Sequence, residues 1–381
     1  VDDIDETSQS PQMHDSDSEI TVSTITWNLA ESSPSEDETL FIKKFRTIKD
    51  TGSDLVVFGS QETENTKPRR TEGSRSVEIR RLLIKMLGKK YVPLSLHSLG
   101  GVQFALFCKR SIIGELEHVT IADVACGIGN VFHNKGAIGA FIQMKARNGD
   151  DAKDSIKRNA SVRMLFIVCH LAAHVKKVEN RNADYWRIVS ELEAQAPHQF
   201  TKGYQRKSAE ENGGERLINS MDHVIVAGDL NYRLDLPREL AEKTVNQIEA
   251  AADEAESRSI RKTLLRHDQL LRSISEKRAF PDFAEGEINF PPTFKFDKGT
   301  DEYDSSHKQR IPAWTDRILF KPFGVKVYEY DSVQSAMHSD HRPVHATLGL
   351  SMKGKERTPG PKREKKKKRR KRRSTSSHED R

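Results

Sequence analysis

The chain has 381 residues, which allows one large domain with flanking tails or two ordinary domains. Apolar residues make up 35% of the chain and charged residues 31%, a balance that predicts an ordered core with disordered ends. No run of about 18 apolar residues is present, so we expect no membrane-spanning helix. Three cysteines without a paired framework indicate a reducing, intracellular location.

The first 20 residues hold seven acids and neither Lys nor Arg, and they are expected to form an acidic disordered tail. From there to residue 350, short apolar runs bounded by turn residues indicate buried strands between helices, in a layered α/β body. The polar stretches 146–161 and 201–219 are expected to be loops. The expected strands are 21–27, 55–58, 102–108, 137–144, 164–169, 223–227, 318–320, 325–330 and 344–350, and the expected helices are 40–50, 76–87, 180–194, 238–257 and 260–275.

Residues 351–381 form a polybasic tail. Between residues 353 and 373 it holds fourteen Lys and Arg against two Glu, a net charge of +12. Such a tail cannot bury apolar area, so we expect it to be disordered in solution. Its charge suits nuclear import or a nucleic acid, an anionic membrane surface, or simply a solubilising end, and the tail alone does not choose among them.

Polar groups able to bind a metal ion or a phosphate stand where several apolar runs end. In α/β sheets such side chains meet at one rim of the sheet, where active sites form. A single Asp or His after a strand is commonly a cap or turn residue, but five such endings in one chain make that explanation inadequate. The five lie at residues 27–28, 58–62, 169–170, 227–231 and 339–341, the last of them ahead of a strand.

The residue types at these ends indicate metal-assisted phosphate chemistry. The carboxylates of Glu62, Asp229 and Asp340 are hard oxygen ligands, as are the amides of Asn28 and Asn231. Such ligands suit Mg²⁺, whereas a zinc site would need more His or Cys. No glycine-rich phosphate loop followed by Lys and Ser or Thr is present, and no cysteine opens a loop that ends in Arg. Attack of water on a phosphate, assisted by a metal ion, is the chemistry that remains.

A basic group lies late in the body. Lys295, Lys308 and Arg310 stand in a segment stiffened by prolines, and together they can present three cations to a polyanion. A solvated surface loop is the alternative interpretation.

The chain resembles the catalytic domain of the inositol polyphosphate 5-phosphatases, within the exonuclease, endonuclease and phosphatase superfamily, from about residue 21 to residue 350. The resemblance is carried by HLAAH at 170–174, GDLNYR at 228–233, the stretch 290–319, SDHRP at 339–343, NKG at 134–136 and DQL at 268–270. It implies a four-layer α/β sandwich, in which two packed mixed β-sheets are flanked by helices.

The resemblance also implies a role for each polar residue at the strand ends. Glu62 and Asn28 would hold Mg²⁺, with Asp340 supporting the metal region. Asp229 would position or deprotonate the attacking water beside Asn231. This division agrees with the needs of an in-line displacement at phosphorus, which requires a positioned nucleophile and neutralised phosphate charge.

The resemblance places the remaining predicted residues around the substrate. His341 would contact the scissile phosphate, oriented by Asp316, and His170 would supply another phosphate contact. Two groups of residues would bind the neighbouring phosphates. The 4-phosphate would face Lys295, Lys308 and Arg310, and the 1-phosphate would lie near Asn134 and Lys135.

Two departures from the family pattern concern the substrate. Phe294 stands where the family usually has Tyr, so a hydroxyl that would reach the 4-phosphate is missing. Asn130 and His133 stand where glycines are usual, and the intervening Val131 and Phe132 suit either insertion among lipid tails or burial against the body.

The interpretation is a Mg²⁺-dependent hydrolase that removes the 5-phosphate from phosphoinositides, chiefly phosphatidylinositol 4,5-bisphosphate, and from soluble inositol polyphosphates. We expect a cytoplasmic monomer that meets anionic membrane surfaces through its polybasic tail, or enters the nucleus through it, without a nucleic acid partner. A non-catalytic phosphoinositide-binding module is disfavoured because every metal and water position holds a competent residue. A nuclease of the same superfamily is disfavoured by the three cations of residues 295–310.

Overall fold

The computed structural model describes residues 18–34, 41–43, 45, 50–64, 73–127, 135–147, 160–201 and 214–353. The polybasic tail beyond residue 353, most of the expected helix at 40–50 and the segment 128–134, which includes Asn134, lie outside the described residues. No helix among those described is both long enough and apolar enough to cross a membrane.

The described strands form two six-stranded sheets. One sheet has the order β11 (Val325–Ser332), β12 (Val344–Ser351), β1 (Glu19–Asn28), β2 (Leu55–Gln61), β4 (Val102–Lys109) and β3 (Tyr91–Leu99). The other has the order β5 (Leu116–Ala125), β6 (Gly136–Lys145), β7 (Ser161–His170), β8 (His223–Asp229), β10 (Asp316–Phe320) and β9 (Ala284–Glu285). Each sheet is mixed, because β1 with β2 and β7 with β8 are parallel pairs among antiparallel ones.

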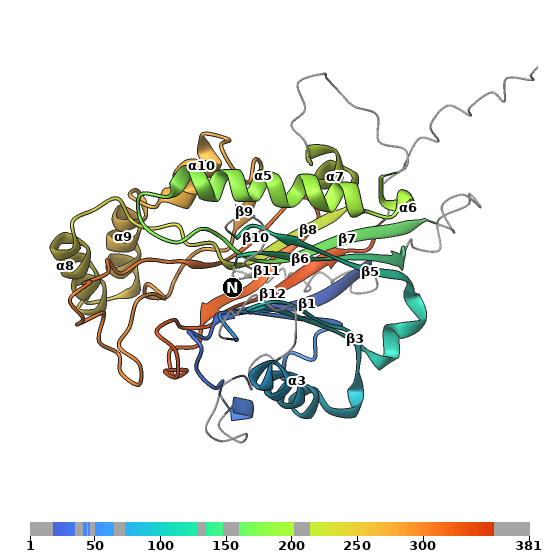
Figure 1. Cartoon of the computed structure of the whole chain (residues 1–381), viewed down its shortest axis with the longest axis horizontal. Coiled ribbons are helices and arrows are strands. Elements are labelled where there is room, and N and C mark those ends of the chain that lie inside the picture. Colours follow the sequence, from blue (N-terminus) through green and yellow to red (C-terminus); the bar gives the residue numbers. More distant parts are fainter. Residues whose placement is uncertain are drawn as a thin grey trace, which may run out of the picture.

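Helices cover both outer faces of the paired sheets, which confirms the predicted four-layer sandwich. Figure 1 shows α3 (Ser74–Leu87) outside one sheet, and α5 (Val178–Gln195) and α7 (Glu215–Ser220) outside the other. The remaining helices are α6 (His198–Thr201), α8 (Arg238–Glu249), α9 (Glu254–Leu265) and α10 (Gln269–Ser275), with short 3-10 turns at Gly88–Lys90 and Arg110–Glu115. α8 and α9 lie together at one end of the molecule, at the left of Figure 1.

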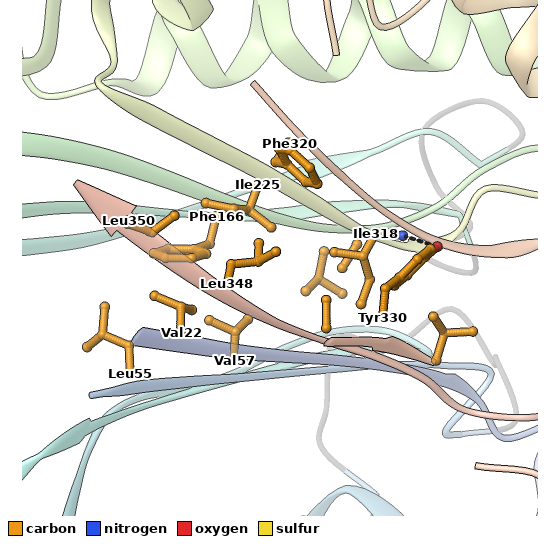
Figure 2. Close-up of a cluster of buried hydrophobic side chains, with 14 of the residues drawn as sticks. Val22, Leu55, Val57, Phe166, Ile225, Ile318, Phe320, Tyr330, Leu348 and Leu350 are labelled. Atoms are coloured by element: carbon orange, nitrogen blue, oxygen red, sulfur yellow. Dashed lines mark hydrogen bonds between the residues drawn. The ribbon is translucent and has the colours of Figure 1, made fainter. Parts of the chain in front are cut away.

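The main hydrophobic core lies between the two sheets. Figure 2 shows side chains from β1 and β2 facing side chains from β7, β8 and β10 across the interface. Burial of each such side chain stabilises the fold by about 1.5–3 kcal/mol relative to exposure. The labelled residues are all buried: Val22, Leu55, Val57, Phe166, Ile225, Ile318, Phe320, Tyr330, Leu348 and Leu350.

The expected helices at 238–257 and 260–275 are wrong in their bounds, since the structure has three helices over this stretch. Asp253 accepts a hydrogen bond from the backbone N–H of Glu256 at 2.8 Å and so begins α9. Asp268 accepts one from Leu271 N at 2.9 Å and begins α10. These N-caps interrupt an apolar periodicity that runs on through them.

Other boundaries differ from expectation as well. β1 begins at Glu19, so the last two residues of the expected acidic tail belong to the sheet. Helix α7 begins inside the stretch 201–219 that was expected to be a loop and ends one residue beyond it. β3 and β5 were missed because most of their residues are only partly buried, which leaves no continuous apolar run.

Candidate active site

Strand register brings the predicted polar residues to one rim of each sheet. Asn28 ends β1 and pairs with Gln61 at the end of the parallel strand β2. His170 ends β7 and pairs with Asp229 at the end of the parallel strand β8. Asp316 begins β10, which runs antiparallel to β8, and it too pairs with Asp229. The prediction that these strand ends carry a common site is therefore consistent with the register of both sheets.

Hydrogen bonds tie the two rims together. Asn28 Nδ2, from one sheet, donates to Asp229 Oδ2 of the other at 2.9 Å. Trp27 Nε1 donates to the carbonyl oxygen of His341 at 3.1 Å, and Ser339 Oγ donates to the carbonyl oxygen of Asn28 at 2.6 Å. The segment that precedes β12 is thereby fixed against the end of β1, and His341 is brought into the same site as Asp229.

Asp229 is the centre of the site and is buried. Its Oδ1 accepts from Asn231 N at 3.0 Å, and its Oδ2 accepts from Asn231 Nδ2 at 3.1 Å and lies 3.2 Å from His170 Nε2. Burial would raise the pKa of Asp229, but the hydrogen bond from His170 and the charge of Lys135 hold that pKa well below its usual value. Asp229 is therefore a carboxylate at any pH near neutral.

Backbone geometry at this point depends on a glycine. A Cβ atom at Gly228 would lie 1.9 Å from the carbonyl oxygen of Cys169, so β7 and β8 can approach only where residue 228 has no side chain. Glu62, directly after β2, and Asn231, two residues after β8, have positive φ angles of 49° and 57°. Strained backbone of this kind clusters at sites where a side chain must be aimed for function.

His170 is buried between a carboxylate and a cation. Its Nε2 lies 3.2 Å from Asp229 Oδ2 and 3.7 Å from Glu62 Oε1, and it also contacts Lys135 Nζ. Burial first and the charge of Lys135 second lower the pKa of His170, and burial lowers the pKa of Lys135 as well. His170 is therefore neutral near pH 7, and Lys135 is placed at the centre of the site.

His341 forms a charged pair with Asp316. His341 Nδ1 donates to Asp316 Oδ2 at 2.8 Å, and the hydroxyls of Thr293 and Thr315 donate to the same oxygen at 2.8 and 2.9 Å. Burial lowers the pKa of His341, but Asp316 outweighs it and raises that pKa to about 9. His341 is thus an imidazolium near neutral pH, and its Nε2 lies 4.0 Å from Asp340 Oδ1.

Arg233 is a site residue that sequence reasoning did not single out. It is buried, it donates from Nε to the carbonyl oxygen of Asn231 at 3.1 Å, and its guanidinium lies 4.0 Å from the ring centroid of Phe294. The Phe294 ring in turn lies 4.6 Å from that of His341. Arg233 is the last residue of the GDLNYR motif, and this position was the signal that could have identified it. Thr315 was also not singled out, and its signal was that it directly precedes Asp316.

The three predicted metal ligands contact two different parts of the site. Glu62, whose side chain is 45% exposed, and Asn28 both face the Asp229 and His170 pair. Within the described part of the chain Asp340 Oδ1 is buried without a hydrogen-bond partner, and it lies on the His341 side. Among the described residues no group of three His, Cys, Asp or Glu side chains is arranged to hold a metal ion.

The site still offers ligands of the kind that Mg²⁺ accepts. Burial would raise the pKa of Glu62, but His170 and Lys135 keep it below its usual value, so Glu62 is ionised. Asn28 Oδ1 accepts a hydrogen bond from Ala30 N at 2.9 Å and presents an amide oxygen at the same rim. One carboxylate and one amide oxygen suit a cation that keeps most of its waters, as Mg²⁺ does.

Two of the three predicted substrate cations are held on a loop built around Asp304. The buried Asp304 side chain accepts from the backbone N–H of Arg310 at 2.7 Å and of Ser306 at 3.2 Å, and lies 3.4 Å from Lys295 Nζ. The charge of Arg310 also reaches His174, whose pKa is lowered first by burial and then by Arg310. Lys308 is exposed on the same loop.

Comparisons with known proteins agree with this geometry. The family described as "Endonuclease/Exonuclease/phosphatase family 2" matches residues 25–347. The type IV inositol polyphosphate 5-phosphatase 11 of Arabidopsis thaliana is 30% identical over 86% of this chain and 81% of its own length. The chain therefore belongs to this family, and within it to the inositol polyphosphate 5-phosphatases.

Longer relatives and a solved structure support the same assignment. The phosphatidylinositol 4,5-bisphosphate 5-phosphatase INP51 of Saccharomyces cerevisiae is 30% identical over 84% of this chain, which spans 30% of that protein. The chain spans only 23–30% of the length of three such relatives. The inositol polyphosphate 5-phosphatase domain of SPsynaptojanin, solved with inositol (1,4)-bisphosphate and a calcium ion, matches with a TM-score of 0.66 and 28% identity, over 87% of this chain and 84% of that one.

Proposed function

We propose that this chain hydrolyses the 5-phosphate of phosphoinositides, chiefly phosphatidylinositol 4,5-bisphosphate, and of soluble inositol polyphosphates. The observation that carries the proposal is that two groups of opposite charge lie in the same site. Asp229 is kept as a carboxylate, and His341 is kept as an imidazolium. A phosphomonoester hydrolase needs both, one for the attacking water and one for the phosphate. The choice of substrate is supported by the relatives, which include a phosphatidylinositol 4,5-bisphosphate 5-phosphatase and an inositol polyphosphate 5-phosphatase.

Asp229 positions the attacking water. A carboxylate whose pKa lies so far below neutral accepts a hydrogen bond readily but takes up a proton only weakly, so orientation is its main contribution. Asn231 and Asn28 fix its two oxygens through hydrogen bonds of 2.9–3.1 Å. The Asp229 carboxylate therefore does not rotate, and it keeps the attacking water in a single orientation.

His341 and Lys135 meet the negative charge of the phosphate. His341 uses Nδ1 for Asp316, which leaves Nε2–H to donate to a phosphate oxygen. Lys135, expected near the 1-phosphate, reaches His170, and we assign its charge to the scissile phosphate instead. Removing one such preorganised donor typically costs a factor of about 10²–10³ in turnover.

Glu62 and Asn28 would hold Mg²⁺. The calcium ion in the SPsynaptojanin complex supports a divalent metal ion in general. When bound, Mg²⁺ supplies Lewis-acid neutralisation of phosphate charge. Lys295, Lys308 and Arg310 would bind the 4-phosphate, with Lys308 free to follow it because that side chain is exposed. Asn134, outside the described residues, keeps its proposed contact with the 1-phosphate.

We also propose that the chain acts as a cytoplasmic monomer, without a nucleic acid partner, and that the polybasic tail brings it to anionic membranes. Each basic residue near an anionic leaflet contributes about 1 kcal/mol, reduced by salt. Deleting residues 362–373 would then lower turnover on vesicles at physiological salt and leave turnover of a soluble inositol phosphate unchanged. Unchanged vesicle binding together with loss of the protein from nuclei would assign the tail to nuclear import instead.

Phosphate release from a substrate panel tests the proposed function. Phosphatidylinositol 4,5-bisphosphate and inositol 1,4,5-trisphosphate should release one phosphate each in the presence of Mg²⁺, whereas phosphatidylinositol 4-phosphate, which has no 5-phosphate, should release none. Tight binding of the bisphosphate without release would favour the non-catalytic module. Cleavage of single-stranded DNA at a higher rate than phosphate release would favour the nuclease.

A further inference from the structure

Gln269 is a buried residue of the DQL motif that the proposed mechanism does not use. It is the first residue of α10, and it is 1% exposed. Its Oε1 accepts from Arg233 N at 3.0 Å and from Arg181 Nη2 at 2.6 Å. Its Nε2 donates to Asp235 Oδ1 at 2.6 Å and to the carbonyl oxygen of Val175 at 3.2 Å. A buried amide with its donors and its acceptor occupied in this way fixes the segments that it joins.

Gln269 holds the backbone of Arg233 on both sides. The backbone N–H of Gln269 donates to the carbonyl oxygen of Arg233 at 2.9 Å, while Gln269 Oε1 accepts from the backbone N–H of Arg233. An antiparallel bridge between Leu234 and Asp268 lies next to these two contacts. The end of the GDLNYR segment is therefore fixed against the start of α10.

Arg233 in turn sets the orientation of the Asn231 amide. Arg233 Nε donates to the carbonyl oxygen of Asn231 at 3.1 Å, and Arg233 Nη2 donates to Asn231 Oδ1. Because Oδ1 is held by a cation, Nδ2 of Asn231 points the other way and donates to Asp229 Oδ2 and to the carbonyl oxygen of Leu171, both at 3.1 Å. If the amide turned over, its oxygen would face the Asp229 carboxylate and both of these hydrogen bonds would be lost.

A second set of contacts joins Gln269 to the HLAAH segment at 170–174. Arg181 of α5 is fully buried, and besides Gln269 it donates to the carbonyl oxygens of Ala172 at 3.2 Å and of His174 at 2.7 Å. His174 has a positive φ angle of 79°, so this hydrogen bond holds a strained backbone in place. Gln269 thus links the two segments that carry His170 and Asp229, the paired residues at the centre of the site.

We propose that Gln269 is a positioning residue for the hydrolysis, which acts through Arg233 and Asn231 to keep the Asp229 carboxylate aimed at the attacking water. The role rests on the proposed function, since it concerns the same reaction. A small displacement of a group that orients the nucleophile lowers the rate of the chemical step. Loss of the Gln269 contacts should therefore lower kcat and leave KM nearly unchanged.

Two substitutions separate positioning from stability. Phosphate release from inositol 1,4,5-trisphosphate with Mg²⁺ is measured well below the unfolding temperature of every variant. Gln269→Leu removes all four side-chain contacts, so kcat should fall by about 30–100-fold with KM within about threefold of the unmodified protein. Gln269→Glu keeps an oxygen for Arg233 and Arg181 but loses the donor to Asp235 and Val175. It should therefore unfold at a lower temperature and still keep kcat within about threefold.

The matched control is Gln143→Leu. Gln143 lies near the end of β6, where it pairs with Arg163 at the start of β7, and its Nε2 donates to Glu117 and Ser161. This variant should lower the unfolding temperature without lowering kcat. If kcat followed the loss of stability in Gln143→Leu and in both Gln269 variants, Gln269 would have only a structural role and the proposal would be overturned.

A double-mutant cycle tests the route through Arg233. Arg233→Met removes the guanidinium that holds Asn231, so adding Gln269→Leu to it should lower kcat by less than about threefold further. Fully additive losses would refute action through Arg233. An unmodified kcat in Gln269→Leu would refute the role of Gln269 and leave the proposed function standing. Absence of phosphate release by the unmodified chain would refute the proposed function, and this role with it.

Discussion

Replacement of Asp316 by Asn tests the charged state of His341. The Asp316 carboxylate lies 2.8 Å from His341 Nδ1 and raises the pKa of the imidazole to about 9 against the opposing effect of burial. An amide keeps the shape and the acceptor but removes the charge, so we expect this pKa to fall to about 6.5 or lower. At 1.36 kcal/mol per pKa unit, the imidazolium loses about 3 kcal/mol of stabilisation.

The sign of the pH dependence follows from the raised pKa. His341 is charged below its pKa and loses its proton as pH rises through it, so the basic limb of kcat/KM should lie near pH 9 in the unmodified protein. In Asp316→Asn this limb should move to about pH 6.5. At pH 8 the protonated fraction would fall about thirtyfold, whereas at pH 6 the two proteins should differ little from this cause.

The assay is a pH profile of kcat/KM on inositol 1,4,5-trisphosphate, which avoids any effect of the membrane surface. Thr293→Val is the matched control, because it removes one hydrogen bond to Asp316 and leaves the charge in place. Its basic limb should stay within about one pH unit of the unmodified protein. A basic limb that remains near pH 9 in Asp316→Asn would refute the assignment of that limb to His341.

Three further substitutions address the metal, the substrate and the cationic loop. Glu62→Gln removes one ligand charge, so half-maximal activity should need at least tenfold more Mg²⁺; a normal Mg²⁺ titration would remove Glu62 from the metal site. Arg310→Ala should reduce kcat/KM about tenfold or more on a 4,5-bisphosphate and far less on a substrate without the 4-phosphate, and equal losses would contradict the contact. Hydrogen bonds and the charge of Lys295 lower the pKa of Asp304 to about 2 although burial opposes it, so the ionised carboxylate stabilises the fold by about 1–2 kcal/mol above pH 4. This contribution should be lost as pH falls toward 2. Acid unfolding curves should show the loss in the unmodified protein and its absence in Asp304→Asn.

Several parts of the site were predictable because their signals are local. His170 and Asp229 directly follow apolar runs, and a strand end places its next residue at the rim of the sheet whatever the rest of the fold does. The GDLNYR and SDHRP motifs carried the resemblance to the family, which the comparisons confirm. The sandwich architecture likewise followed from the resemblance together with the alternation of strands and helices.

Helix boundaries were less predictable, because they depend on single hydrogen bonds. The apolar period runs through Asp253 and Asp268, and a new helix starts at each because its carboxylate accepts a hydrogen bond from the backbone N–H three residues further on. Composition favours an Asp at such a position, but an Asp on an exposed helical face has the same sequence signature.

The residue types at the strand ends, and hence the class of chemistry, were determined by the sequence itself. Which of those groups meet was decided only by the tertiary structure. Trp27 binds the backbone of His341 across 314 positions, Asn28 meets Asp229 across 201, and Lys135 reaches His170 instead of standing apart from it. The physical reason is that periodicity encodes which face of a strand or helix is buried, whereas pairing between distant polar atoms depends on sheet register and on the packing of one sheet against the other.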